Sequence, residues 1–154
     1  MLNSKYFLLL LYLVIMEKNE PEHTNTATYC KRFNQDRATE LFEIIEKHLR
    51  QNNRYRNSHY TQAQLAEELN IPRRYVIASI FKCTGYKYNQ FINLMRMNSV
   101  MRMMHAANCQ HMTIEDIAFM AGYASRQGFY IAFKRMYGCS PHIYRKGIVI
   151  NAEE

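Results

Sequence analysis

Residues that could perform catalysis occur along the chain, but their spacing does not support that role. The carboxylates within residues 54–147 form two pairs, Glu67-Glu68 and Glu115-Asp116. The members of each pair are neighbours in sequence, so on a helix they point to different faces and cannot share one acid–base task. The six histidines form no cluster, and no Ser/His/Asp arrangement or glycine-rich phosphate loop is present. We therefore predict that the chain is not an enzyme.

The cysteine spacing predicts a chain without a structural metal site. The four cysteines lie 53, 26 and 30 residues apart, and no C-x-x-C pair or suitably spaced histidine accompanies them. This pattern is typical of reduced thiols in the cytosol rather than of disulfides in a secreted protein. We expect a cytoplasmic protein that needs no metal ion or other cofactor.

Positive charge is concentrated in one block of the chain. The 154 residues carry 20 Lys and Arg against 13 Asp and Glu, which gives a net charge of +7. Residues 1–53 are balanced, whereas residues 54–147 hold 13 basic and only 4 acidic side chains, a net charge of +9. Such a block attracts polyanions, so we predict a polyanion-binding surface within it.

The elements that must position these charges are predicted to be helices. An apolar share of 48% with only 5 Gly and 3 Pro allows a chain of this length to bury a core in one compact unit. From residue 37 onward, apolar residues recur at three- and four-residue steps, and no alternating strand pattern follows, so we expect an all-α fold. The first helix is indicated by Leu41, Ile44, Ile45, His48 and Leu49.

An uninterrupted apolar run, Tyr6–Met16, precedes this region. As a helix it would span only about 16 Å of a hydrocarbon core near 30 Å, so it cannot cross a bilayer alone. A secretory signal is not expected, because only Lys5 precedes the run and a polar segment follows it. Three interpretations stay open: a segment that packs on the protein, the trailing half of a transmembrane helix from a longer parent, or an extension without a specific role.

The basic block contains an internal repeat at an offset of 52 residues. Seven positions match, which marks a repeated supersecondary unit. The matched residues are Thr61, Leu65, Ala66, Asn70, Ile71, Phe81 and Lys82 in the first copy and Thr113, Ile117, Ala118, Gly122, Tyr123, Phe133 and Lys134 in the second.

Each copy is predicted to fold as two short helices joined by a tight turn. A threonine N-cap with Gln64 or Asp116 three residues later suits a capping box, and Asn70 or Gly122 suits a left-handed turn after the first helix. The second helices are expected over Arg73–Cys83 and Arg126–Tyr137. A helix-turn-helix whose second helix is basic and partly exposed fits the major groove of DNA.

A long helix is predicted between the two copies, from about Lys87 to Ala107. Its 21 residues would span roughly 31 Å, which approaches the roughly 34 Å of one DNA turn. Such a spacer can hold the two second helices near successive major grooves. Its apolar stripe, expected to pack against both copies, consists of Phe91, Ile92, Met95, Ser99, Val100, Met103 and Met104.

Over about Ala38–Gly147 the sequence resembles the AraC/XylS family of bacterial transcription regulators. The most specific segment is Ile117–Gly147, which combines Ile-Ala-x-x-x-Gly-Tyr, Phe-x-x-x-Phe-Lys and Gly-x-Ser-Pro-x-x-Tyr-Arg. Gln64–Gly85 is the second matching segment. Pro141 after Ser140 supports this alignment independently, because proline is favoured in the first turn of a helix.

The resemblance implies a fold of about seven helices, in which two helix-turn-helix subdomains are joined by a long bridging helix. We expect this DNA-binding domain to span residues 37–147. It would be preceded by an apolar segment and polar linker over residues 1–36 and followed by a tail over residues 148–154.

The resemblance also implies a set of DNA-contacting residues. Those expected to face the bases are Arg74, Ile77 and Ala78 in the first copy and Arg126, Gln127, Tyr130 and Ile131 in the second. Arginine can donate two hydrogen bonds to guanine, and glutamine can pair with adenine. Phosphate contacts are expected from Lys82, Lys134, Arg145 and the backbone at Thr113. Arg73 and Ser125 belong to the same expected interface, whereas the matching family arginine, Arg96, is expected to be structural first.

The partners implied are double-stranded promoter DNA and RNA polymerase, and the expected location is the nucleoid. One alternative hypothesis is the output fragment of a membrane-anchored sensor, with membrane contact through Tyr6–Met16. Another is a helical module that docks on a protein or a membrane.

Overall fold

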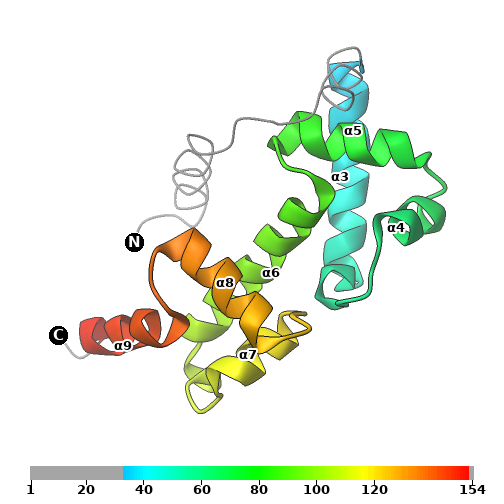
Figure 1. Ribbon diagram of the computed structural model, residues 1–154. Helices are drawn as coiled ribbons and strands as arrows, with labels where there is room; N and C mark the ends of the chain where they lie inside the picture. Colours follow the sequence, from blue (N-terminus) through cyan, green and yellow to red (C-terminus); the bar gives the residue numbers. More distant parts are fainter. Residues whose placement is uncertain (1–32, 153–154) are drawn as a thin grey trace.

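The computed structural model describes residues 33–152, with side chains up to Gly147. In this range it contains seven α-helices, two 3-10 turns and no strand, which confirms the all-α prediction (Figure 1). The apolar run Tyr6–Met16 and most of the predicted linker lie outside the described residues. The elements in chain order are α3 (Gln35–Gln51), η1 (Arg54–Arg56), α4 (Gln62–Glu68), α5 (Arg73–Thr84), α6 (Tyr88–His105), η2 (Ala107–Cys109), α7 (Ile114–Met120), α8 (Arg126–Tyr137) and α9 (Pro141–Ala152).

The bounds of α5, of α6 and of the tail differ from the prediction, whereas those of α8 agree with it. α8 has the predicted bounds, and α5 ends one residue beyond its predicted end. The bridging helix α6 is shorter than predicted, because Ala106 adopts an extended conformation with φ −80° and ψ 126°. Its 18 residues span about 27 Å. α9 continues to Ala152, so part of the predicted tail is helical.

Both copies of the repeat begin with the predicted capping box. The Thr61 hydroxyl accepts from the Gln64 amide at 3.2 Å, and the Gln64 side chain accepts from the Thr61 amide at 2.8 Å. Thr113 and Asp116 make the same exchange at 3.0 and 3.2 Å. Two backbone donors at each helix start are thereby satisfied, which fixes where α4 and α7 begin.

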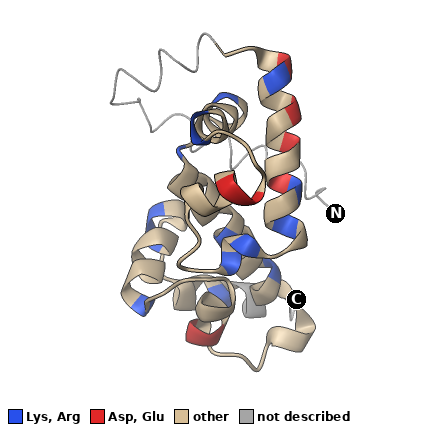
Figure 2. Ribbon diagram, turned by 90° about the vertical axis from the view of Figure 1, so that its right-hand side faces the viewer, with Lys and Arg blue, Asp and Glu red and all other residues tan. Residues whose placement is uncertain are grey.

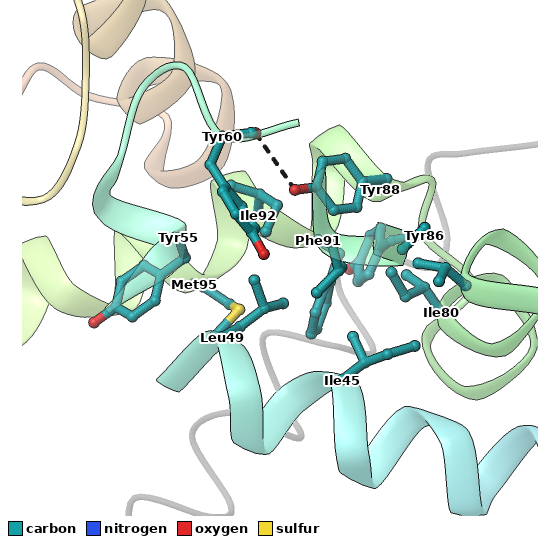
Figure 3. Close-up of a cluster of buried hydrophobic side chains, with 13 residues drawn as sticks. Ile45, Leu49, Tyr55, Tyr60, Ile80, Tyr86, Tyr88, Phe91, Ile92 and Met95 are labelled. Carbon is teal, nitrogen blue, oxygen red and sulfur yellow. Dashed lines mark hydrogen bonds between the residues drawn. The ribbon is translucent and has the colours of Figure 1, made fainter. Parts of the chain in front are cut away.

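A first hydrophobic core forms where α3, α4, α5 and the first half of α6 meet (Figure 3). Ile45 and Leu49 of α3 point into this core, and the Tyr88 hydroxyl donates to the Tyr60 carbonyl at 3.4 Å across it. Ile44, which the apolar pattern also assigned to the core-facing stripe, is 42% exposed. The cluster contains Ile45, Leu49, Tyr55, Tyr60, Leu65, Ala66, Val76, Ile80, Tyr86, Tyr88, Phe91, Ile92 and Met95.

A second core forms around the other half of α6, where α7 and α8 pack. Phe129 and Phe133 of α8 are fully buried in it, and their rings are 5.7 Å apart. The bridging helix therefore contributes to both cores, as predicted from its apolar stripe. The second cluster contains Met97, Val100, Met101, Met104, Ile114, Ile117, Ala118, Ala121, Tyr123, Phe129 and Phe133.

The second copy also touches the η1 turn, which precedes the first copy, beside the bridging helix. Gly122, in the turn between α7 and α8, lies against the backbone of Arg56 in η1, so that a Cβ atom at this glycine would be 2.3 Å from the Arg56 carbonyl oxygen. The Tyr123 hydroxyl donates to Asn93 Oδ1 of α6 at 2.8 Å. Arg56 in turn donates to the buried Ser99 hydroxyl of α6 at 3.1 Å. These contacts hold the second helix-turn-helix, η1 and α6 together.

Candidate nucleic-acid interface

The first helix-turn-helix presents its positive charge at the start of α5. Arg73 and Arg74 are the first two residues of the helix, and both are exposed. Arg73 donates to Gln62 Oε1 of α4 at 3.3 Å, while the Arg74 guanidinium lies over the Tyr75 ring at 5.1 Å. They therefore stand at the end of the second helix, which is the end that enters the major groove in helix-turn-helix proteins.

Further along α5, fewer of the predicted DNA-contacting residues are exposed than the sequence led us to expect. Ala78 is fully buried, so it cannot contact a base, and its assignment to the base-facing side is wrong. Ile77 is half-buried. These side chains are covered because α5 packs extensively against α3 (Figure 1). The spacing of residues within α5 alone did not indicate that this face of the helix would be buried. The Lys82 ammonium, expected to bind phosphate, donates to the carbonyl of Phe33 just before α3.

The second helix-turn-helix exposes more of its second helix. Ser125 caps α8, since its hydroxyl accepts from the Gly128 amide at 3.1 Å. Beyond this cap, the exposed side chains of α8 include four of the predicted contact residues, and Ile131 is 62% exposed. They are Arg126, Gln127, Ile131 and Lys134. Arg135, which the sequence reasoning did not single out, is exposed beside Lys134.

Arg126 is held by two neighbouring side chains. Its Nε lies 3.0 Å from Glu115 Oε1 of α7, and its guanidinium lies 5.1 Å from the centre of the Tyr130 ring. Contacts with Tyr130 and with Glu115 raise the pKa of the guanidinium above its ordinary value. The arginine is still largely solvent-exposed, with 67% of its side chain accessible.

Tyr130 was expected to face the bases, but its hydroxyl is engaged within the protein. It donates to Glu115 Oε1 at 3.2 Å and lies 2.7 Å from His142 Nε2 of α9. The ring is half-buried. Sequence reasoning missed Glu115 and His142, although Glu115 stands in the first turn of α7, where a carboxylate is favoured by the helix dipole. Only the packing of α7, α8 and α9 brings the three side chains together.

Arg145 and Thr113, which were predicted to contact phosphate, form hydrogen bonds within the protein. The Arg145 guanidinium donates to the carbonyls of Met112 and Gln110, both at 2.5 Å, and thereby ties α9 to the loop before α7. The Thr113 amide donates to Asp116, whose pKa is held below its ordinary value by hydrogen bonds from Thr113. The negative charge of this carboxylate repels a phosphate at the same helix start.

Arg96 has the structural role expected of it. Its Nε donates to the Tyr55 carbonyl at 2.6 Å, and its Nη2 donates to the Asn57 carbonyl at 3.0 Å. Burial lowers the pKa of this half-buried guanidinium. Arg96 thereby fixes the η1 turn on the bridging helix. Because η1 contacts Gly122, this also helps to fix the position of the second helix-turn-helix.

Comparison with known proteins agrees with this geometry. A family model described as a helix-turn-helix domain matches residues 65–147, which is more than half of the chain. The chain belongs to the AraC-type helix-turn-helix family. A similar fold occurs in the crystal structure of the C-terminal domain of the two-component response regulator yesN from Fusobacterium nucleatum subsp. nucleatum, with a TM-score of 0.59 and 22% identity. The match covers 69% of this chain and 98% of that one. No curated protein matches the sequence at a significant level.

As an AraC-type protein, the chain carries a DNA-binding domain of transcription regulators. Its charge distribution fits that assignment. Acidic residues are most frequent in α3, where basic residues alternate with them, whereas the elements that follow are mainly basic (Figure 2). In residues 54–147 the 13 basic side chains face only 4 acidic ones.

Within residues 33–152, no group of three or more His, Cys, Asp or Glu side chains is arranged to hold a metal ion. Cys83, Cys109 and Cys139 form no disulfide there. None of the described helices combines the length and the apolar character needed to cross a membrane.

Proposed function

We propose that this AraC-type protein is a sequence-specific transcription regulator that inserts α5 and α8 into successive major grooves of promoter DNA. The observation that carries the proposal is the pair of second helices, each exposing arginine at its N-terminal end: Arg73 and Arg74 on α5, and Arg126 on α8. In Figure 1, α5 crosses in front of α3 and α8 crosses in front of α6, so both are accessible from one side of the molecule.

The spacing of the two helices supports simultaneous insertion. They lie toward opposite ends of α6 (Figure 1), whose 18 residues span about 27 Å. One turn of DNA measures about 34 Å, so neighbouring grooves are within reach of the two helices with modest bending. The contacts of Gly122 and Tyr123 beside the bridging helix keep this spacing fixed.

The two helices are expected to contribute unequally to sequence recognition. On α8, Arg126 and Gln127 offer hydrogen bonds to base edges, and Ile131 can contact a thymine methyl group. On α5, the burial of Ala78 leaves the two arginines at the helix start as the main contacts. Base readout should therefore depend mainly on α8, and α5 should contribute mainly to affinity.

The dependence of affinity on salt tests DNA binding. Six to eight neutralised phosphates should give a log–log slope of about −5 to −7 between binding constant and salt concentration. A slope near zero would contradict the proposal.

Footprinting on genomic DNA tests sequence recognition. The full chain should give discrete footprints, and Arg126→Ala should lose them while retaining general affinity for DNA. Lys47→Ala is the matched control, because Lys47 is exposed on α3, outside both second helices, and its loss removes the same charge. Unchanged footprints with Arg126→Ala would contradict the assignment of α8 as the reading helix.

A second candidate function is docking on a protein or a membrane. The exposed side chains of Phe119 (78%) and Met120 (47%) at the end of α7 favour it, together with the apolar run Tyr6–Met16 in the sequence. Deleting residues 1–20 separates the candidates. DNA binding should survive this deletion, whereas association with liposomes that depends on the apolar run should be lost. Contact with RNA polymerase, implied by the family resemblance, stays a prediction.

A further inference from the structure

The contacts of Arg126 determine which of its hydrogen-bond donors are presented to solvent. Glu115 Oε1 occupies the Nε side of the guanidinium at 3.0 Å, and the Tyr130 ring covers one of its faces at 5.1 Å. A guanidinium has five N–H donors in a fixed planar arrangement. With Nε engaged, the two terminal nitrogens at the outer edge remain to form a pair of parallel hydrogen bonds.

The side chain that holds Arg126 is itself fixed. The Tyr130 hydroxyl donates to the same Glu115 oxygen at 3.2 Å, and His142 of α9 lies 2.7 Å from that hydroxyl. Three helices, α7, α8 and α9, thus contribute one residue or more to a connected group around a single exposed arginine. Such supporting contacts reduce the conformational entropy that a long side chain loses on binding.

The charge of Glu115 also selects the kind of group that Arg126 can bind. A phosphate next to the guanidinium would lie near the carboxylate, and the two anions would repel each other. The major-groove edge of guanine carries two neutral acceptors, O6 and N7, which match a pair of parallel donors. The carboxylate therefore disfavours a phosphate more than it disfavours a guanine.

We propose that Glu115, supported by Tyr130, is a positioning residue that makes Arg126 a reader of guanine rather than a phosphate contact. This inference rests on the proposed function and refines it. It assigns one guanine in the DNA target to Arg126, and it assigns control of that recognition to Glu115 on α7, the first helix of the motif. Glu115 acts through Arg126.

The test starts from a random-sequence duplex DNA library. The full wild-type chain is used to select and sequence its preferred site. Affinity is then measured for that site, for sites in which each guanine is replaced in turn, and for unrelated duplex DNA. The variants are Arg126→Ala, Glu115→Gln and the double variant. Glu43→Gln on α3 is the control for the change in net charge, because Glu43 is exposed and distant in sequence from the interface.

The wild-type chain should prefer guanine at one position by about 5- to 150-fold, and Arg126→Ala should remove that preference. Glu115→Gln should weaken the same preference and raise affinity for unrelated DNA more than Glu43→Gln does, because the freed guanidinium can then bind phosphate. In the Arg126→Ala background, Glu115→Gln should have no effect on base preference. A loss of helical structure in a variant is checked by circular dichroism.

Two outcomes would overturn the inference. One is a guanine preference that depends on Arg126 but is unchanged by Glu115→Gln. The other is an Arg126→Ala variant that binds all sequences equally less well, with a salt slope reduced in magnitude by about 1, as expected of a phosphate contact. If the wild-type chain selects no preferred sequence, the proposed function itself fails, which is a distinct result.

Discussion

Adding a methyl group at Gly122 should destabilise the protein far more than adding one at Gly138. Both glycines have positive φ, +100° and +76°, a region in which a residue with a Cβ atom is strained by about 1–2 kcal/mol. At Gly138 nothing lies within 4 Å of the added Cβ. At Gly122 the added Cβ would be 2.3 Å from the backbone oxygen of Arg56, whereas ordinary contact begins near 3.4 Å.

The difference between the two variants measures the contact between the second helix-turn-helix and the η1 turn. Gly138→Ala should lower the free energy of unfolding by about 1 kcal/mol, the backbone term alone, partly offset by the lower entropy of the unfolded chain. Gly122→Ala should lower it by at least about 3 kcal/mol, because a rigid backbone segment of η1 must move. At roughly 4 °C per kcal/mol, the corresponding losses in Tm are about 4 °C and at least about 12 °C.

Urea unfolding followed by circular dichroism at low temperature gives both free energies, and thermal scans give Tm. DNA affinity of the folded fraction is measured in parallel, since a displaced η1 changes the distance between α5 and α8. Equal destabilisation by Gly122→Ala and Gly138→Ala would refute the reasoning, because it would mean that the Arg56 backbone does not confine Gly122.

Three further substitutions test other contacts. Arg96→Met should lower the free energy of unfolding by about 2–4 kcal/mol, measured in urea, because it leaves two carbonyls of the η1 turn without their charged donor. Hydrogen bonding by His48 lowers the pKa of Glu68 below its ordinary value of 4.5. The ionised Glu68 therefore stabilises the fold above about pH 4.5, and this contribution is lost as the pH falls through the lowered pKa. Glu68→Gln should remove this dependence and make the free energy of unfolding fall less steeply with decreasing pH. Thr113→Val should lower the free energy of unfolding by about 1 kcal/mol, measured by thermal unfolding, because it removes the N-cap of α7. A change below about 0.3 kcal/mol, about half of RT, would contradict the stabilising role of this cap.

The burial of Ala78 on α5 shows why part of the proposed DNA interface could not be predicted from the sequence. Helix periodicity placed Ala78 with Arg74 and Ile77 on one side of α5, but Arg74 is exposed, Ile77 is half-buried and Ala78 is fully buried. The side that meets DNA depends on which faces α3 and α6 cover, and α3 covers more of α5 than the sequence indicates. Arg145 is a similar case, because its carbonyl partners lie 33 and 35 residues away along the chain.

The sequence by itself determined the features that depend on neighbouring residues. Threonine with an acceptor three positions later fixes a helix start, and Asn70 and Gly122 both adopt the left-handed turn that the repeat predicts, with φ values of 52° and 100°. These are interactions within one or two helical turns, so their residues are adjacent in the sequence.

Only the tertiary structure decided what each of these turns touches. Asn70 is exposed and keeps a side chain, whereas the equivalent Gly122 is buried against the η1 turn and has no space for one. In the same way, the sequence supplied Arg126 and Tyr130 four residues apart on α8, but only the packing of α7 and α9 placed Glu115 against Arg126 and His142 against Tyr130. Contacts between helices far apart in the chain depend on crossing positions that local patterns do not specify.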